Sequence, residues 1–439
     1  MKTAAFKTLG CKVNQYETQL IREQFLNAGF KEVSPRLPAD VYVINTCTVT
    51  QKTDAESRRI IKAARRTNPS CRIVVTGCYT ELDEEEIKRL DDRLIIIKNS
   101  QKSKILRHLL SPSAITQATP QGCTPQGCTP LGCKEVINAF EGRTKAFVKV
   151  QDGCDNFCSY CKVPLVRGTS RSRPPDEVIS EISQLVANGY KEIVLTGICL
   201  GNWGKELNLA LSHLLNEIRG RVEGTFRIRL SSIEPWYVTD ELIETIARTK
   251  NICRHLHIPM QSGDDAVLKK MNRNFTSKAF VDLINKLRLR MPGVAFTTDI
   301  VVGFPGEEAG HFNNTLRLVE TAKPSRMHIF PFSRRKGTKA YFFKEIVPGY
   351  VVADRIKRLK SIGGRLALGY QRQCTGQPVE VLVETKRDKQ TGLLVGYTDT
   401  YIKVGFEGPD ELKGTLQLAG VLPLTNQNSC DILVAHLLH

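Results

Sequence analysis

Short apolar runs and longer amphipathic stretches take turns along the first 110 residues. Four runs, at residues 4–9, 41–45, 73–76 and 94–97, have the length and apolar content of buried strands. Amphipathic stretches such as residues 15–28 lie between them and predict helices. A strand that alternates with a helix in this way predicts a parallel sheet with helices on both faces, the doubly wound α/β fold.

The same alternation returns on a larger scale between residues 140 and 370. Six repeats over this length favour a partial (βα) barrel of the TIM type, short of the usual eight repeats. From residue 371 the pattern changes to alternating strands at 379–383, 401–404 and 414–417, with glycine at the turns, which predicts a small β-barrel. The six strands predicted for the central part are residues 146–150, 192–195, 227–231, 255–258, 295–302 and 326–330.

Residues 111–139 interrupt this pattern, and we expect them to form a linker. They contain Thr-Pro-Gln-Gly-Cys twice and Thr-Pro-Leu-Gly-Cys once, ending at Cys123, Cys128 and Cys133. Proline and glycine in every five residues oppose both helix and sheet. The three thiols could bind a metal, but each would have to be ordered against this composition. The predicted domains are residues 1–110, 140–370 and 371–439.

Charge points to a polyanionic partner. The chain has 63 basic and 45 acidic residues, a formal net charge of +18. Of this, +7 falls in residues 1–110, +13 in residues 111–369 and −2 in residues 370–439. Basic surface gains affinity by releasing counterions from phosphates, so nucleic acid is the expected partner. The last segment is acidic and adds no bulk attraction for RNA.

The sequence disfavours the membrane and secreted classes. No run of 18 or more apolar residues could span a bilayer, so no membrane partner is expected. The stretch Thr8-Leu9-Gly10-Cys11 resembles a lipoprotein cleavage site, but Lys2 and Lys7 leave no room for the apolar stretch of a signal peptide. Fourteen cysteines without such a signal predict a reducing, cytoplasmic location and metal or redox chemistry.

Cys154, Cys158 and Cys161 form a Cys-x₃-Cys-x₂-Cys run directly after the predicted strand 146–150. Three thiolates this close can hold three irons of a [4Fe–4S] cluster and leave the fourth iron open to another ligand. A structural zinc is the alternative, but it requires four protein ligands, and no nearby His or Cys completes the set.

A second group of cysteines is spread over the N-terminal part. Cys11, Cys47 and Cys78 each follow the carboxyl end of a predicted parallel strand, which is the edge where open α/β sheets bind ligands. We therefore expect the three thiols to converge, although coincidence among buried cysteines is the alternative. Cys71 precedes its strand and is expected to be a buried structural thiol.

The run from Gln151 to Cys161, Gln-Asp-Gly-Cys-Asp-Asn-Phe-Cys-Ser-Tyr-Cys, resembles the signature of radical S-adenosylmethionine enzymes. In that family the methionine group of S-adenosylmethionine chelates the open iron, and cleavage of the sulfonium gives a 5′-deoxyadenosyl radical. The resemblance implies S-adenosylmethionine as a cofactor and an electron donor as a partner. It also places Tyr160 near the adenine of the cofactor; the alternative is a core aromatic residue.

Two sets of three cysteines in one chain resemble the methylthiotransferase family, over nearly the whole length. The resemblance implies two [4Fe–4S] clusters, held by Cys154, Cys158 and Cys161 and by Cys11, Cys47 and Cys78. One activates the C2–H bond of a modified adenine in tRNA, and the other delivers a methylthio group to that carbon. It further implies that the C-terminal barrel is of the RNA-binding TRAM type.

Local sequence resembles one subgroup of that family. Thr8-Leu-Gly-Cys-Lys-Val-Asn14 and Val43-Ile-Asn-Thr-Cys-Thr-Val-Thr50 are similar to the MtaB subgroup, which acts on N6-threonylcarbamoyladenosine at tRNA position 37. Enzymes for N6-isopentenyladenosine typically read Gly-Cys-Gln-Met-Asn at the first site, and those for a ribosomal-protein aspartate read Gly-Cys-Pro-Lys-Asn. The alternatives are the same chemistry on those two substrates and a non-catalytic iron–sulfur RNA-binding protein.

Further candidates lie at the ends of predicted barrel strands, where such barrels place their sites. The resemblance implies that Gly197 lets the backbone approach the methionine amino group and that Glu234 or a neighbour contacts the cofactor. Glu234 could instead favour a helix N-terminus ahead of Pro235. His257, at the next strand end, is as consistent with a structural role as with a functional one.

Three arginines follow the Cys154 loop within a few residues. They could bind an RNA backbone beside the reaction centre or form a solvated basic loop. These arginines are Arg167, Arg171 and Arg173.

Overall fold

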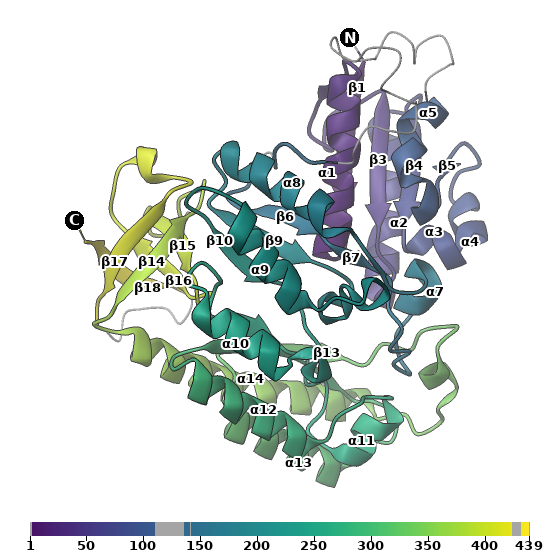
Figure 1. Ribbon diagram of the computed structural model, residues 1–439. Helices are drawn as coiled ribbons and strands as arrows, with labels where there is room; N and C mark the ends of the chain where they lie inside the picture. The colour runs from purple at the N-terminus through teal and green to yellow at the C-terminus, as the bar shows by residue number, and fades with distance from the viewer. Residues whose placement is uncertain (1, 110–135, 141, 424–431, 439) are drawn as a thin grey trace.

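The structure, a computed structural model, describes residues 2–109, 136–140, 142–423 and 432–438. Figure 1 shows an N-terminal sheet (purple and blue), a central curved sheet surrounded by helices (teal and green) and a C-terminal barrel (yellow), with the central part between the other two. The expected repeat with Cys123, Cys128 and Cys133 lies outside the described residues. Within the described part of the chain, no helix is both long and apolar enough to cross a membrane.

The N-terminal sheet is parallel throughout, with the order β2-β1-β3-β4-β5. Buried apolar clusters lie on both of its faces, so the predicted doubly wound fold is confirmed. Its strands are β1 (Thr3–Thr8), β2 (Lys31–Glu32), β3 (Val41–Thr46), β4 (Arg72–Gly77) and β5 (Ile95–Ile96). Its helices are α1 (Lys12–Asn27), α2 (Gln51–Thr67), α3 (Tyr79–Leu82), α4 (Glu84–Lys88), the 3₁₀ helix η1 (Asn99–Lys104) and α5 (Ile105–Leu109).

The central part is an open half-barrel of six parallel strands. Two three-stranded sheets, β10-β9-β6 and β11-β12-β13, meet through isolated bridges such as Ser232 with His257. The six predicted strands are all present, and the partial barrel is confirmed. They are β6 (Ala146–Lys149), β9 (Glu192–Thr196), β10 (Arg227–Leu230), β11 (His255–His257), β12 (Ala295–Val302) and β13 (Arg326–Pro331).

Helices surround the half-barrel, and one small strand pair, β7 (Gln151–Asp152) with β8 (Arg171–Ser172), flanks the cysteine loop. The α-helices are α7 (Val163–Arg167), α8 (Pro175–Ala187), α9 (Leu211–Arg221), α10 (Asp240–Arg248), α11 (Asp265–Lys270), α12 (Ser277–Arg290), α13 (Ala309–Ala322) and α14 (Gly349–Cys374). The short 3₁₀ helices are η3 (Leu200–Asn202), η4 (Lys205–Leu207), η5 (Pro235–Tyr237) and η6 (Lys339–Phe342).

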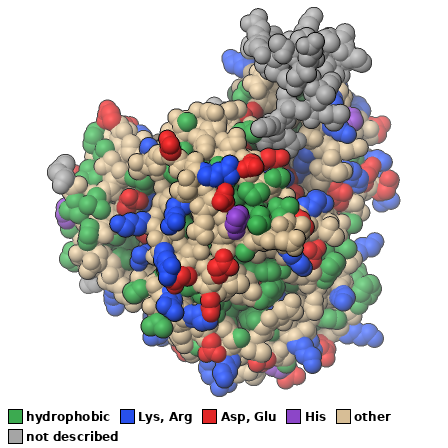
Figure 2. Space-filling model, viewed as in Figure 1, with side chains coloured by type: hydrophobic (Ala, Val, Ile, Leu, Met, Phe, Trp, Pro, Cys, Tyr) green, Lys and Arg blue, Asp and Glu red, His purple; other side chains and the backbone are tan. Residues whose placement is uncertain are grey.

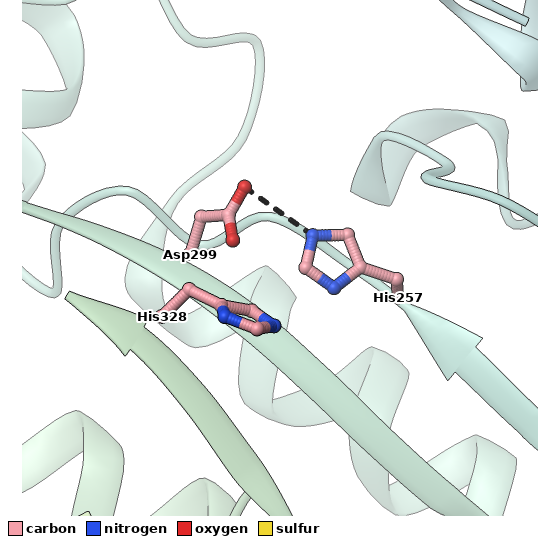
Figure 3. A group of neighbouring side chains, drawn as sticks. All are labelled: His257, Asp299 and His328. Carbon is pink, nitrogen blue, oxygen red and sulfur yellow. Dashed lines mark ion pairs between the residues drawn. The ribbon is translucent and has the colours of Figure 1, made fainter. Parts of the chain in front are cut away.

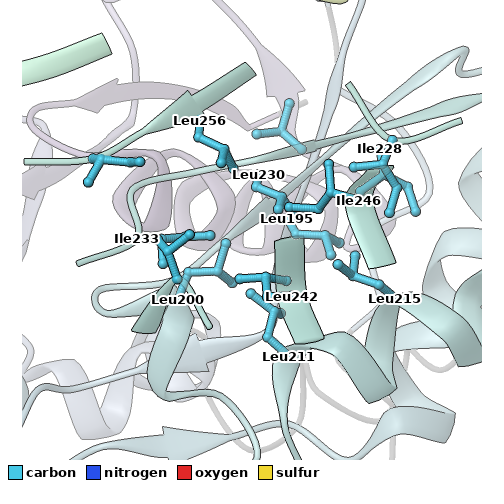
Figure 4. Close-up of a cluster of buried hydrophobic side chains, with 14 of the residues drawn as sticks. Leu195, Leu200, Leu211, Leu215, Ile228, Leu230, Ile233, Leu242, Ile246 and Leu256 are labelled. Atoms are coloured by element: carbon cyan, nitrogen blue, oxygen red, sulfur yellow. The ribbon is translucent and has the colours of Figure 1, made fainter. Parts of the chain in front are cut away.

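The strands of the half-barrel have an apolar outer face and a polar inner face. On β10, Ile228 and Leu230 belong to the main core with the leucines of α9 and α10 (Figure 4). The alternate residues Arg227 and Arg229 point the other way and pair with Glu192 of β9. Because side chains alternate along a strand, burying one face against helices leaves the other face free to carry charge.

The C-terminal part is a closed five-stranded barrel, as the sequence predicts. Two of its strands were missed. In β15 the glycine at 396 weakens the strand pattern, yet a side chain there would lie 2.3 Å from the Leu382 carbonyl oxygen. β18 follows residues 424–431 and shows no clear alternation. The strands are β14 (Pro378–Val383), β15 (Leu394–Thr398), β16 (Lys403–Phe406), β17 (Leu416–Val421) and β18 (Leu433–Leu437), with the 3₁₀ helix η7 (Asp410–Leu412).

Two buried arginines attach this barrel to the half-barrel. Arg227 donates to the Tyr397 carbonyl (2.7 Å), and Arg229 donates to the carbonyls of Thr398 (2.9 Å) and Asp399 (2.8 Å). Glu192, fully buried, accepts from both arginines. Burial alone would raise the pKa of Glu192, but the adjacent cations lower it to about 2. Glu192 is therefore the buried carboxylate shared by both arginines, and the exposed Glu380 adds a second pair with Arg227 at 3.5 Å.

The expected linker ends earlier than residue 139. Ile137 and Phe140 are buried in the central core, and the Ile137 amide donates to Glu181 at 3.0 Å. Two apolar residues after the repeat suffice to dock the chain here, because each gains about 2 kcal/mol from burial.

Replacing Glu192 tests the junction. Glu192→Gln should lower the free energy of unfolding by about 3 kcal/mol, because it leaves the buried Arg229 without a carboxylate and Arg227 with only the exposed Glu380. Urea unfolding followed by the fluorescence of Trp203 and Trp236, the two tryptophans of the chain, measures it. Glu217→Gln, which removes an exposed pair with Arg221, is the matched control and should cost less than about 0.5 kcal/mol.

The effect should depend on pH in one direction. A carboxylate whose pKa is lowered on folding stabilises the protein above its ordinary pKa of 4.5 and loses this contribution as the pH falls toward 2. The difference in free energy of unfolding between the wild type and Glu192→Gln should become smaller as the pH falls from 4.5 toward 2. Equal stability of the two proteins at pH 7 would contradict the assignment.

Candidate active site

The structure gathers Cys11, Cys47 and Cys78 at one edge of the N-terminal sheet. They directly follow, or come three residues after, the carboxyl ends of the adjacent strands β1, β3 and β4. The Cys47 thiol interacts electrostatically with both other thiols. The predicted convergence is therefore present. Cys71 is buried at the opposite end of β4, also as expected.

Glycine before each of two cysteines allows the strand ends to approach. Gly10 has a φ of +89°, and a Cβ there would lie 2.6 Å from the Cβ of Cys47. Gly77 has a φ of +103°, and a Cβ there would lie 2.2 Å from the Thr46 carbonyl oxygen. Asn14 then joins the two loops, because its amide donates to the carbonyls of Leu9 (2.8 Å) and Thr46 (2.9 Å).

The second set, Cys154, Cys158 and Cys161, lies on the loop after β6 and β7. Gly153 begins this loop with a φ of +75°, where a Cβ would lie 1.9 Å from the Thr169 carbonyl oxygen. Gln151 holds the loop from beneath: its amide donates to the Gly153 carbonyl (2.8 Å) and to Ser170 (2.9 Å). The loop therefore has a fixed shape even though all three cysteines keep partial solvent access.

Each set has one thiol that accepts a hydrogen bond from a buried arginine, and the two arginines differ. Arg273 donates to the Sγ of Cys158 at 3.5 Å, and Arg167 donates to the Sγ of Cys78 at 3.4 Å. Burial raises the pKa of Cys161 and of Cys47 to about 12. Metal ligation requires thiolates, so a cationic metal and these arginines would have to overcome the cost of desolvation.

Glu234 lies at this second set but contacts an arginine. It forms a two-pronged ion pair with the buried Arg273, which also donates to the Pro259 carbonyl at 3.1 Å. Glu234 also stands at the N-cap of η5, the helix N-terminus expected as the alternative, although its side chain forms no cap hydrogen bond there. Glu234 thus orients the arginine that bonds Cys158.

Tyr160 and Gly197 also lie beside this loop. Tyr160 packs edge-on against Phe304 at 6.3 Å between ring centres. A Cβ at Gly197 would lie 2.8 Å from the Gln151 side-chain oxygen, which accepts from the amide of Cys199 at 2.8 Å. The glycine therefore makes room for the glutamine that holds the loop.

Cys199 is a fourth thiol at this loop, so the expectation that no nearby cysteine could complete a set of four was wrong. It is buried after β9, where Asn156 donates to its Sγ at 3.5 Å. A hydrogen bond between the Cys199 and Cys154 thiols raises the pKa of Cys199 and lowers that of Cys154. Its position three residues past a barrel strand was the available signal.

The expectation for Arg167 and Arg173 was wrong in both its forms. Arg167 is buried and donates to Asn14 and Glu17 of α1, and Arg173 is bound to Glu181 and to the Lys149 carbonyl. Neither side chain is available to an RNA backbone or forms a solvated loop. Arg171 alone of the three is exposed.

Glu17 lies at the centre of this contact between the two parts of the chain. It pairs with Lys102, Lys149 and Arg167, and these cations hold its pKa well below the ordinary range although burial alone would raise it. Lys102 belongs to the N-terminal part, and the other two cations belong to the half-barrel. The network fixes one cysteine set relative to the other.

The inner face of β11, β12 and β13 carries a cluster of polar side chains (Figure 3). His257 pairs with Asp299 at 3.3 Å, and its other ring nitrogen lies 2.8 Å from the Thr297 hydroxyl. The register places Asp299 opposite His328 and Thr297 opposite Arg326. His257 is therefore part of a cluster of polar side chains and not an isolated histidine.

Comparison with known proteins agrees with this geometry. Residues 3–97 match the model of the uncharacterised protein family UPF0004, and residues 148–319 match that of the radical SAM superfamily. Threonylcarbamoyladenosine tRNA methylthiotransferase MtaB of Bacillus subtilis is 41% identical over 425 residues, which cover 96% of this chain and 94% of that protein. The protein of the same name from Thermotoga maritima is 39% identical and covers 93% and 92%.

The chain belongs to the methylthiotransferase family of radical S-adenosylmethionine enzymes.

More distant relatives include other methylthiotransferases. The tRNA-2-methylthio-N6-dimethylallyladenosine synthase of Clostridium tetani is 33% identical and covers 92% of this chain and 90% of that protein. A solved radical S-adenosylmethionine methyltransferase, TsrM of Kitasatospora setae, has the same fold with a TM-score of 0.54, 16% identity and 77% of each chain covered.

As a radical S-adenosylmethionine enzyme, this methylthiotransferase uses an iron–sulfur cluster and S-adenosylmethionine. The donor set fits such a cluster: three partly accessible thiols on a fixed loop, one of which accepts a hydrogen bond from a buried arginine. Hydrogen bonds to sulfur and limited solvent access are among the factors that set the reduction potential of such clusters.

Replacing Arg167 tests the ion-pair network around Glu17 that joins the two parts of the chain. Arg167→Gln should lower the free energy of unfolding by about 3 kcal/mol, because it removes a counter-charge of the buried Glu17. It should leave the slope of log affinity for tRNA against log salt unchanged, because the side chain touches no solvent.

Arg171→Gln is the matched control, since it removes the same charge from an exposed position four residues further along the chain, at the start of β8. It should change stability by less than about 0.5 kcal/mol. A salt slope that falls by about one in Arg167→Gln, as a lost phosphate contact would give, would contradict the buried placement.

Proposed function

We propose that this methylthiotransferase converts N6-threonylcarbamoyladenosine at position 37 of tRNA into its 2-methylthio derivative. The observation that carries the proposal is the 41% identity to a protein of that named activity over 96% of the chain, with both cysteine sets assembled in the structure. The Gly10-Cys11-Lys12 sequence favours this substrate over isopentenyladenosine or a protein side chain.

Two [4Fe–4S] clusters are part of the proposal. Cys154, Cys158 and Cys161 would ligate one, and Cys11, Cys47 and Cys78 the other. Each set supplies three thiolates, so each cluster would keep one iron free for a non-protein ligand. When bound, these groups and S-adenosylmethionine supply a carbon-centred radical for the C2–H bond of the base and a methylthio group for that carbon.

The residues of the chain supply position and charge. Gln151 holds the radical loop, and Gly197 gives it the space to do so. Arg273 donates to Cys158, and Glu234 neutralises the charge of this arginine. Arg167 likewise donates to Cys78, and Glu17 neutralises its charge. We assign Tyr160, Gly197 and Glu234 to the cofactor side of the site on this basis, through the loop that they shape.

Binding of tRNA would use a distributed basic surface. On the face shown in Figure 2, lysine and arginine are interleaved with acidic residues and do not form one block. The net charge of +18 then supplies salt-dependent attraction, and placed contacts supply selection. An electron donor is a further required partner, and a cytoplasmic location suits the reduced thiols.

Nucleoside analysis tests the function. Cells that lack this chain should accumulate N6-threonylcarbamoyladenosine in tRNA, and the 2-methylthio derivative should return when the wild-type chain is expressed but not when Cys154→Ala is expressed. Liquid chromatography with mass spectrometry of digested tRNA measures both nucleosides. Restoration of a methylthio-isopentenyl nucleoside instead would support the alternative substrate.

Iron analysis tests the ligand sets. The anaerobically reconstituted chain should hold about eight irons. Simultaneous replacement of Cys154, Cys158 and Cys161 by alanine should remove about half of them, because the second set is ligated independently. Cys199→Ala is the matched control: it removes a buried thiol at the same loop and should retain all of the iron. Saturation of the wild type at four irons, or loss of iron from the control, would overturn this assignment.

A further inference from the structure

A lysine next to the N-terminal set of cysteines, Lys12, has no role in the proposed function. Lys12 directly follows Cys11 and is the first residue of α1, whose first turn contains no acidic residue. A cation at this end of a helix is opposed by the helix dipole, at a cost of about 0.3–1 kcal/mol. The sequence therefore places a charge where local structure disfavours it.

Lys12 also differs from the other lysines around the site. Lys102 and Lys149 pair with Glu17, and Lys162 pairs with Asp83. In the part of the chain that the structure describes, Lys12 forms no ion pair and no side-chain hydrogen bond. Its electrostatic neighbours are the cations Arg229 and Lys145 and, with favourable sign, Cys11 and the half-barrel residue Asp299, so it lies where the N-terminal cysteines meet the half-barrel.

The inner face of β13 extends the cluster of His257, Asp299 and His328. Arg326, His328 and Phe330 alternate with the core-facing residues of the strand and remain accessible. Phe330 is 45% exposed and stacks on His328 with 6.5 Å between ring centres. Arg326, like Lys12, has no ion-pair partner among the residues placed by the structure.

The cluster therefore has a surplus of cations. Asp299, 3.3 Å from His257, is a single carboxylate beside two cations, Lys12 and Arg326, neither of which forms an ion pair among the described residues. A divalent metal at His257, Asp299 and His328, whose ligand atoms lie within 4.8 Å of one another, would be repelled by these cations. An anionic group is the ligand that such a surplus favours.

We infer that Lys12 and the polar inner face of β11, β12 and β13 form a binding site for the carboxylate of the substrate's threonylcarbamoyl group. This rests on the proposed function. The carboxylate lies on the N6 substituent, and C6 is separated from the reacting C2 by a single ring nitrogen. A base whose C2 is presented to the Cys11 set thus brings its N6 substituent near the residue next to Cys11.

An RNA phosphate is the other source of such an anion, and binding measurements distinguish the two. The probes are three anticodon stem-loops that carry N6-threonylcarbamoyladenosine, N6-methylcarbamoyladenosine or unmodified adenosine at position 37. The second has the urea group without the carboxylate. Fluorescence anisotropy with the reconstituted full chain, without S-adenosylmethionine, measures each affinity.

The wild type should bind the threonylcarbamoyl loop about tenfold more tightly than the methylcarbamoyl loop, as expected for one charge-assisted hydrogen bond. Lys12→Gln should abolish this preference, and Lys12→Arg should retain it. Lys31→Gln is the matched control, since it removes an exposed lysine from the opposite edge of the same sheet. Iron content should be equal in all four proteins.

Four results would overturn the inference. Lys12→Gln could weaken all three loops equally, which would assign the lysine to a phosphate. It could leave the preference intact. Bound zinc or manganese that disappears in His257→Ala, detected by elemental analysis, would make the cluster a metal site. A wild type that methylthiolates threonylcarbamoyladenosine but does not bind the threonylcarbamoyl loop more tightly than the methylcarbamoyl loop would contradict the inference alone. Failure to methylthiolate threonylcarbamoyladenosine in the nucleoside assay would contradict the proposed function.

Discussion

The buried carboxylate of Glu17 is the interaction on which the arrangement of the site depends. It lies on α1, three residues after Asn14, which joins the loops of Cys11 and Cys47. Through Lys149 and Arg167 it also holds the strand and the helix that flank the Cys154 loop. A buried carboxylate without partners would be too costly to keep ionised, so the three cations and the acid require one another. The relative position of two cysteine sets in different parts of the fold is thereby fixed by electrostatics as well as by packing.

The positions of the six cysteines were predictable because they follow from backbone rules. Parallel strands end at one edge, so cysteines after β1, β3 and β4 had to approach each other, and the short spacing of Cys154, Cys158 and Cys161 confines them to one loop. The fold was predictable for the same reason: strand and helix periodicities differ, and all six strands of the half-barrel carry a clear apolar run. The misses, β15 and β18, are strands in which a glycine or a lack of alternation removed that signal.

The partners of the charged residues were not predictable from local sequence. Arg167 and Arg173 lie in a stretch rich in basic residues, and nothing in that stretch indicates that Glu17 and Glu181 would enclose them. Arg273 is 39 residues from Glu234 and 115 from Cys158. Such contacts depend on which elements the fold brings together, and only the structure contains that information. The same holds for Cys199, which is close to Cys154 because β9 is the neighbour of β6.

An open half-barrel keeps some of its inward-facing side chains accessible, which a closed barrel does not. In a full eight-stranded barrel the interior is filled by side chains, whereas here six strands leave an edge, β13, whose inward residues stay accessible. Helix α1 of the N-terminal part packs against β6 at the other edge, and the C-terminal barrel is bound to Arg227 and Arg229. Both added parts therefore limit access to the interior without filling it. A polar interior is tolerated because the apolar outer face already supplies the core, so the inner face is free to be shaped by the charge and form of a substrate.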